Sequence, residues 1–147
     1  MTSKSLADIV GNYNMVSHSD NFEDYLKKLD VNFLIRKVVM NSNTFVEITH
    51  EQHEDKYTQK QKVGPKTVVF SYKLGVPFDE ETLDGRKCKS LMISIPAKEG
   101  ELAVQHEQNW KGKKVTITYE FREDTVTTTF KFEGVTVSQV YKRIPNQ

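Results

Sequence analysis

Cysteine and long apolar runs are scarce in this chain of 147 residues. Its single cysteine, Cys88, has no partner for an internal disulfide, which is typical of proteins from reducing compartments. No apolar run approaches the roughly 20 residues that a membrane-spanning helix needs. The first ten residues lack the apolar centre of a secretory signal, so we expect a cytoplasmic protein and disfavour a secreted one.

Excess charge of either sign is missing as well. The chain has 21 basic and 20 acidic residues, for a formal net charge of +1. This balance gives no electrostatic reason to bind a polyanion, so nucleic acid is not an expected partner. The length suits a single domain over residues 1–147, large enough to enclose an interior.

Catalytic motifs are absent too. The run His50-Glu51-Gln52-His53 lacks the spacing of the His-Glu-x-x-His zinc motif and falls in a hairpin-like stretch. His18 and His106 have no companion nucleophile in the sequence, and no glycine loop could hold a phosphate. The stretch Phe78–Glu81 is interpreted as an acidic turn. We therefore predict a protein that is not an enzyme and that uses no metal or cofactor.

One region has helical periodicity. Asp20 and Glu23 match a capping box, in which two side chains satisfy backbone donors at a helix start. A second apolar segment, Phe33–Met40, follows a short polar break, so we predict two short helices joined by a tight turn. The first helix has apolar residues at i, i+3, i+4 and i+7, which are Phe22, Tyr25, Leu26 and Leu29.

The rest of the chain alternates between strand-like runs and turn residues such as Gly112 and Glu133-Gly134. Short connections favour successive antiparallel hairpins. The predicted strands are Val10–Ser17, Thr44–His50, Lys56–Gln61, Lys66–Lys73, Phe78–Thr82, Cys88–Ile95, Leu102–Gln108, Lys114–Arg122, Thr125–Phe132 and Val135–Ile144.

The last three strands each have one bulky apolar face, because successive side chains alternate across a strand. A long meander with one apolar face must close into a barrel or stack as two sheets. We predict an all-β fold, a ten-stranded antiparallel up-and-down barrel. Because an eight-stranded barrel is already filled by its own side chains, ten strands should leave room for ligand or water. The predicted aromatic walls of that space are Phe121, Phe130 and Phe132.

A few polar residues interrupt the apolar face. Gln139 and Tyr141 lie two residues apart on it, and Tyr119 and Thr128 lie on the neighbouring strands. A buried polar group left unpaired costs roughly 1–3 kcal/mol. These groups therefore either pair with one another and with water, which we favour for Thr128, or bind a ligand's polar end, which we favour for Gln139 and Tyr141.

Several short runs, spread over almost the whole chain, form one recognisable pattern: Gly11-Asn12-Tyr13, Asn21–Lys27 with Arg36-Lys37, Leu74–Glu80, Asp84–Ser90, Gly134-Val135-Thr136 and Val140-Tyr141-Lys142. In this order and spacing they resemble the intracellular lipid-binding proteins, the family of cytosolic fatty-acid-binding and retinoid-binding proteins. The resemblance implies a β-clam with a helix-turn-helix lid and a monomeric carrier of fatty acid or another hydrophobic molecule. We expect the portal at Phe22, Tyr25 and Leu26 and, unlike a secreted lipocalin-like barrel, an intracellular protein.

The chain departs from that pattern at the acid-binding positions. Many fatty-acid-binding members hold the ligand carboxylate with two inward arginines and a tyrosine. Here the tyrosine corresponds to Tyr141, whereas the arginine positions hold Gln139 and Tyr119, and alternation puts Arg122 on the outer face. A carboxylate in a low-dielectric cavity favours a cationic partner. Three hypotheses remain: a fatty acid binds more weakly than in those members, the acid binds partly protonated, or the natural ligand is neutral. The third is suggested by retinol-binding members, which also have glutamine where an arginine would lie.

The resemblance raises three further expectations. Residues 50–55 and 96–101 form longer loops than in typical members, and Gly64-Pro65 occupies a portal position that often holds phenylalanine. Some members use a basic cluster on the lid for nuclear import or for contact with anionic membranes. The corresponding residues here are Lys27, Arg36 and Lys37. The simpler interpretation is that these are ordinary solvated side chains on the surface of the lid. A nuclear as well as cytoplasmic location is therefore considered.

Overall fold

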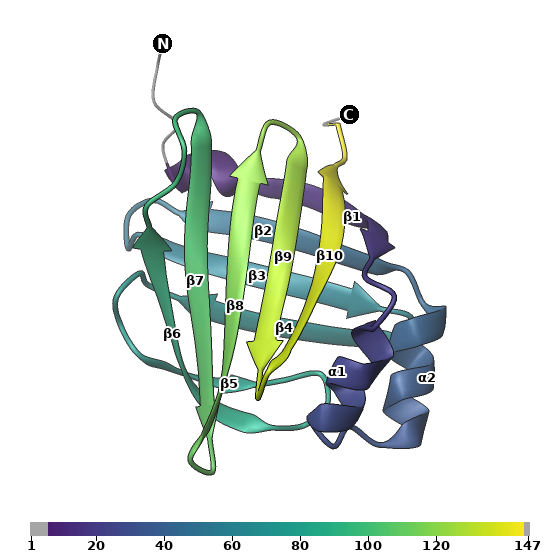
Figure 1. Ribbon diagram of the computed structural model, residues 1–147. Coiled ribbons are helices and arrows are strands. Elements are labelled where there is room, and N and C mark those ends of the chain that lie inside the picture. Colours follow the sequence, from purple (N-terminus) through teal and green to yellow (C-terminus); the bar gives the residue numbers. More distant parts are fainter. Residues whose placement is uncertain (1–5, 146–147) are drawn as a thin grey trace.

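The computed structural model describes residues 6–145 and forms one antiparallel barrel of ten strands (Figure 1). All ten predicted strands are present, with ends that differ from the prediction by at most two residues. The bounds are β1 Gly11–His18, β2 Thr44–Glu51, β3 Lys56–Val63, β4 Lys66–Tyr72, β5 Phe78–Glu81, β6 Lys87–Ile95, β7 Glu101–Trp110, β8 Lys113–Arg122, β9 Thr125–Phe132 and β10 Val135–Arg143.

The sheet order is β4-β3-β2-β1-β10-β9-β8-β7-β6-β5. Strands that follow one another in the sequence are therefore paired, with two differences: the first strand also pairs with the last, and β4 does not pair with β5. β1 pairs with both β2 and β10, which joins the first strand to the last. β4 and β5 share no ladder, and aromatic rings bridge them instead: Phe78 lies 6.0 Å from Phe70 and 5.9 Å from Tyr72 between ring centroids. In Figure 1 the strands β6–β10 cross steeply over β2–β4, which gives the flattened barrel of the predicted β-clam.

Two hairpins show why the register is so regular. Lys111 and Gly112 have φ angles of 48° and 73°, and Glu133 and Gly134 have 45° and 82°. Two successive positive φ angles define the type I′ turn, whose twist matches that of paired strands. These turns hold β7 to β8 and β9 to β10, so the apolar faces predicted for the last three strands point inward together.

Two helices, α1 (Phe22–Lys28) and α2 (Phe33–Asn41), lie side by side at one end of the barrel (Figure 1). Asn32 caps α2, and its side chain accepts a hydrogen bond of 2.9 Å from the amide of Ile35. The predicted capping box at the start of α1 is wrong. The cap residue is Asn21, whose φ and ψ of −90° and 17° are not extended, and its side chain makes no cap bond. Glu23 instead pairs with Arg36, at 3.7 Å.

A short 3-10 helix, η1 (Leu6–Ile9), precedes β1. Its last residue, Ile9, is buried, and the hydroxyl of Tyr13 donates a 2.6 Å hydrogen bond to the Ile9 carbonyl. The guanidinium of Arg143 donates to the carbonyl of Asp8 at 2.8 Å, which joins η1 to the last strand. Within residues 6–145, no helix is both long enough and apolar enough to cross a membrane.

Candidate functional site

An internal space of about 130 Å³, here called the lid cavity, lies between the two helices and the inner faces of the strands. A cavity needs about 10–15 Å³ per water on this scale, so the space would hold on the order of ten water molecules. Its helical wall includes the three predicted portal residues Phe22, Tyr25 and Leu26, all buried. Phe130 lies against the first two of these rings, at 5.6 and 5.4 Å between centroids.

A smaller space of about 30 Å³, the inner cavity, lies deeper in the barrel. Its walls are largely apolar and include Tyr13, Phe121 and Thr128. The two spaces share Gln61, Tyr119, Phe130, Gln139 and Tyr141 as wall residues, so these side chains stand between them.

Most of the residues predicted to line a cavity from the last strands do so. Tyr119, Gln139, Tyr141 and Phe130 line both spaces, and Phe121 and Thr128 line the inner cavity. Phe132 lines neither of them. It lies at the turn end of β9, where it is buried and stacks on Trp110 at 5.5 Å between centroids. Alternation along the strand predicts its face but not how far the cavity extends toward the turn.

Three neutral residues, Tyr119, Gln139 and Tyr141, form what we call the late-strand polar group. The hydroxyl of Tyr141 donates a 2.7 Å hydrogen bond to Oε1 of Gln139. Burial raises the pKa of Tyr141, and burial above all raises the pKa of Tyr119 well above its usual value. Both phenols therefore stay protonated at neutral pH, and this group presents hydrogen bonds without charge.

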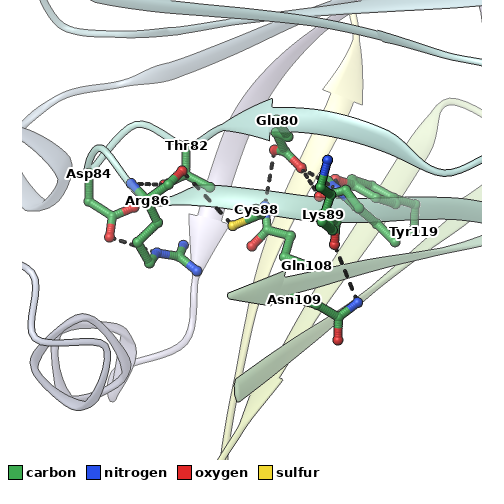
Figure 2. A network of polar contacts seen from close by, with 11 residues as sticks. Glu80, Thr82, Asp84, Arg86, Cys88, Lys89, Gln108, Asn109 and Tyr119 are labelled. Atoms are coloured by element: carbon green, nitrogen blue, oxygen red, sulfur yellow. Dashed lines mark hydrogen bonds and ion pairs between the residues drawn. The ribbon is translucent and has the colours of Figure 1, made fainter. Parts of the chain in front are cut away.

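A buried carboxylate also lines the lid cavity, in what we call the Glu80 network of Glu80, Ser90, His106 and Gln108. Figure 2 shows Glu80 with Gln108 and Tyr119 near it. Glu80 accepts hydrogen bonds from Ser90 Oγ at 2.8 Å and Gln108 Nε2 at 3.0 Å, and its Oε1 lies 2.7 Å from His106 Nε2. Burial alone would raise the pKa of Glu80, but these three partners outweigh burial and lower it. The carboxylate is therefore ionised at neutral pH.

The geometry of this network assigns its protons. A carboxylate can only accept, so His106 Nε2 carries a proton and the amide nitrogen of Gln108 faces Glu80. His106 Nδ1 is 3.2 Å from the hydroxyl of Tyr119, which links the network to the late-strand polar group. Gln108 Oε1 is left buried without a hydrogen-bond partner.

Two interpretations of the next segment follow from the sequence, a strand over Phe78–Thr82 and an acidic turn over Phe78–Glu81. The strand is confirmed as β5 and the acidic turn is wrong, because Glu80 is buried and lines the cavity. The sequence did contain a signal for the inward position of Glu80. Because side chains alternate between the two faces of a strand, Glu80 lies on the same face as the apolar Phe78. Ser90, His106 and Gln108 lie on the inner faces of predicted strands, but their contact with Glu80 depends on the pairing of β5 with β6 and of β6 with β7.

Arg86, which sequence reasoning also missed, lies just before β6 and lines the lid cavity. Its Nε donates to Oδ2 of Asp84 at 2.8 Å, and its guanidinium carbon is 4.5 Å from the centre of the Trp110 ring. Asp84 also accepts a 2.7 Å hydrogen bond from the hydroxyl of Thr82. The Nη1 atom of Arg86 is buried and has no hydrogen-bond partner.

The predicted basic residues of the lid do not form a uniform exposed set. Lys27 and Lys37 are exposed. Arg36 turns inward, where it donates a 2.7 Å hydrogen bond to the carbonyl of Val31 and has a side chain only 19% exposed. Two apolar residues of α2, Phe33 and Leu34, are 57% and 74% exposed. Within residues 6–145, no group of three or more histidine, cysteine or acidic side chains is placed to hold a metal ion.

The barrel, the lid and the enclosed space with its polar groups define a protein built to contain a small molecule, and comparison with known proteins agrees. Residues 10–144 match the model of the lipocalin / cytosolic fatty-acid binding protein family. The cellular retinoic acid-binding protein 1 of Takifugu rubripes is 36% identical over 143 residues, covering 94% of this chain and 99% of the relative. A fatty acid-binding protein of Tyrophagus putrescentiae is 35% identical over 139 residues, with coverage of 94% and 99%.

A solved structure agrees with these sequence relatives. The Schistosoma mansoni fatty acid binding protein in complex with arachidonic acid superposes with a TM-score of 0.84 at 27% identity, covering 97% of this chain and all of that one. The chain belongs to the lipocalin / cytosolic fatty-acid binding protein family. The resemblance carried by its sequence motifs is confirmed.

Proposed function

We propose that this protein is a carrier that encloses a long-chain fatty acid or a related hydrophobic molecule and transports or buffers it. The observation that carries the proposal is the lid cavity, a space between the lid and the strands whose lining combines apolar side chains with convergent polar groups. The relatives named as retinoic acid-binding and fatty acid-binding proteins, and the relative solved with arachidonic acid, support the same class of ligand.

The late-strand polar group is proposed to contact an uncharged polar end of the ligand, such as a hydroxyl or a protonated acid. Gln139 and Tyr141 are joined by a hydrogen bond and line both spaces, and Tyr119 lies on the same walls. The hydrocarbon chain would lie along Phe130 and Phe121. Because this group has no cation, a neutral lipid such as a retinoid alcohol is the favoured alternative to a fatty acid.

Mass spectrometry of the organic extract of gently purified protein tests this proposal. We expect one lipid molecule per chain, and we expect added lipid to be recovered chemically unchanged after incubation. Conversion of the lipid to a product would identify an enzyme instead. Failure to retain or bind any fatty acid, fatty alcohol or retinoid would contradict the carrier function.

Delivery to an anionic membrane is proposed for the outer surface of the lid. Phe33 and Leu34 expose apolar surface on α2, and Lys37 lies beside them, with its Nζ 5.3 Å from the centre of the Phe33 ring. Apolar side chains flanked by lysines are typical of segments that bind membrane surfaces. Nuclear import through Lys27, Arg36 and Lys37 is the second candidate, and the inward position of Arg36 makes it the less favoured one.

Transfer of a fluorescent lipid to anionic vesicles distinguishes these surfaces. We expect transfer to slow with added salt, with Lys27→Glu and with Leu34→Ser. Lys131→Glu, which makes the same charge change on the exposed face of β9, is the matched control and should leave the rate unchanged. Transfer indifferent to salt and to both lid variants would argue against membrane contact. The carrier is proposed to act as a monomer in the cytoplasm.

A further inference from the structure

The charges on the cavity wall are unevenly distributed. Among the described residues that line the lid cavity, Arg86 is the one lysine or arginine, and the acidic residues are Glu80 and Asp84. The late-strand polar group, which lines the same cavity, is entirely neutral. Arg86 is therefore the permanently charged cation that this lining offers to an ionised acid.

The acidic residues near Arg86 already have partners. Both oxygens of Glu80 accept hydrogen bonds within the Glu80 network. The two oxygens of Asp84 are used by Thr82 and by Nε of Arg86. Within residues 6–145, Arg86 pairs with Asp84 through its Nε atom, and Asp84 neutralises part of its charge.

The guanidinium keeps unused donors in a fixed orientation. Only its Nε is committed to Asp84, and Nη1 has no hydrogen-bond partner. Its plane is held over the Trp110 ring, at 4.5 Å. A planar guanidinium offers paired N–H groups that match a carboxylate, so this arrangement is prepared for an anionic acceptor.

A phenol from the lid lies close to the same cation. Tyr25 of α1 also lines the lid cavity and interacts electrostatically with Arg86. Burial raises the pKa of Tyr25, so its hydroxyl stays protonated and can donate. A guanidinium and a phenol hydroxyl therefore both line the lid cavity and belong to residues outside the late-strand polar group.

We propose that Arg86, with Tyr25 beside it, is an anion-binding subsite, so that an ionised lipid acid binds with its carboxylate beneath the lid. Neutral lipids place their hydroxyl at Gln139 and Tyr141 instead, and the orientation of the ligand depends on its charge. The inference rests on the proposed carrier function and specifies the class of ligand group that each end of the cavity takes.

Binding of palmitate and 1-hexadecanol, two chains of equal length, tests this subsite at pH 7.4. Arg86→Met is expected to lower the ratio of palmitate to hexadecanol affinity by roughly tenfold or more, the size of a lost charge-assisted hydrogen bond. Arg86→Lys should recover part of the ratio. Arg122→Met removes the same charge from an outward side chain that is 76% exposed and should leave the ratio unchanged.

The wild-type protein provides a test that does not depend on a variant that folds. With palmitate labelled with carbon-13 at the methylene next to the carboxylate, we expect nuclear Overhauser contacts to the Tyr25 ring. Contacts to the Tyr141 ring, or equal loss of both ligands in Arg86→Met, would overturn the subsite while leaving the carrier function intact. A wild-type protein that binds neither ligand would overturn both.

Discussion

Gln139 is, at the scale of single residues, the position proposed to distinguish neutral from acidic ligands. Its amide and the phenol of Tyr141 offer hydrogen bonds but no charge. A hydrogen bond to an uncharged partner is worth about 0.5–1.5 kcal/mol, whereas one that involves a charge is worth about 1.5–3 kcal/mol. Under the proposed binding mode, a change of this residue should therefore shift the balance between neutral and acidic ligands.

Gln139→Arg should tighten the binding of a fatty acid relative to the matching fatty alcohol by roughly tenfold, because it adds a cation to the cavity wall. Competition titrations with palmitate and hexadecanol measure the ratio. Gln139→Ala and Tyr141→Phe should instead weaken the alcohol. An unchanged ratio in all three variants would show that the late-strand polar group does not contact the ligand.

Glu80 makes the stability of the protein depend on pH. Its folded-state pKa is lower than in the unfolded chain, so its contribution is present above the unfolded value and is lost as pH falls through the folded value. Glu80→Gln replaces a carboxylate oxygen, which accepts hydrogen bonds, with an amide nitrogen whose N–H groups would face the donors of the Glu80 network. We expect it to lower the unfolding free energy by about 1–3 kcal/mol at pH 7, and by less in acid.

Urea denaturation between pH 3 and pH 7 measures this difference. Glu120→Gln, on the exposed face of β8, is the control and should follow the wild type. A loss of stability that is the same at pH 3 as at pH 7 would mean that the ionised form of Glu80 contributes nothing.

At the scale of secondary-structure elements, the two lid helices differ in what holds their first turn. The side chain of Asn32 closes the first turn of α2, whereas the side chain of Asn21 donates a 3.3 Å hydrogen bond to the carbonyl of Thr136 on β10. The start of α1 is therefore held by the barrel and the start of α2 by its own sequence. α2 is the helix that can loosen independently.

Asn32→Ala should cost about 1 kcal/mol of stability, the usual value of a lost cap, and should speed ligand release because α2 forms part of the lid. Asn21→Ala should cost less than half of that. Thermal denaturation and stopped-flow release of a fluorescent fatty acid measure the two effects. Equal costs for both variants would show that the cap of α2 is not what holds the lid.

The whole molecule combines a closed wall with an unfilled interior. Every strand pairs with two others except β4 and β5, and the rings of Phe70, Tyr72 and Phe78 bridge that gap. Tight packing is the norm in protein interiors, so space left inside the barrel forgoes contacts that a ligand could supply.

Ligand binding should therefore stabilise the protein by mass action. A free ligand concentration of about 100 times Kd adds about 2.7 kcal/mol to the unfolding free energy when only the folded state binds. A rise in Tm that scales with the logarithm of hexadecanol or palmitate concentration would confirm this behaviour. No change at saturating ligand would indicate that the lipid binds outside the cavity or not at all.

The sequence by itself determined the strands, their turns, the two helices and the inward faces of the last strands. These properties depend on local alternation, on helical periodicity and on turn residues such as Lys111-Gly112, which act over a few positions. The same local information was sufficient to predict Tyr119, Gln139 and Tyr141 as inward-facing. It was misleading at the first helix start, where backbone geometry and a contact with β10 override the capping pattern, and at Phe78–Glu81, which is a strand and not an acidic turn.

Only the tertiary structure decided which distant residues meet. Glu80 became a buried hydrogen-bonded carboxylate because β5, β6 and β7 pair in one register, and Arg86 entered the cavity wall because Trp110 supports it from another strand. Phe132 faces the predicted side but lies outside the cavity, because Trp110 covers it. Alternation specifies the face of a strand, whereas contacts across the barrel depend on register and curvature, which no local pattern encodes.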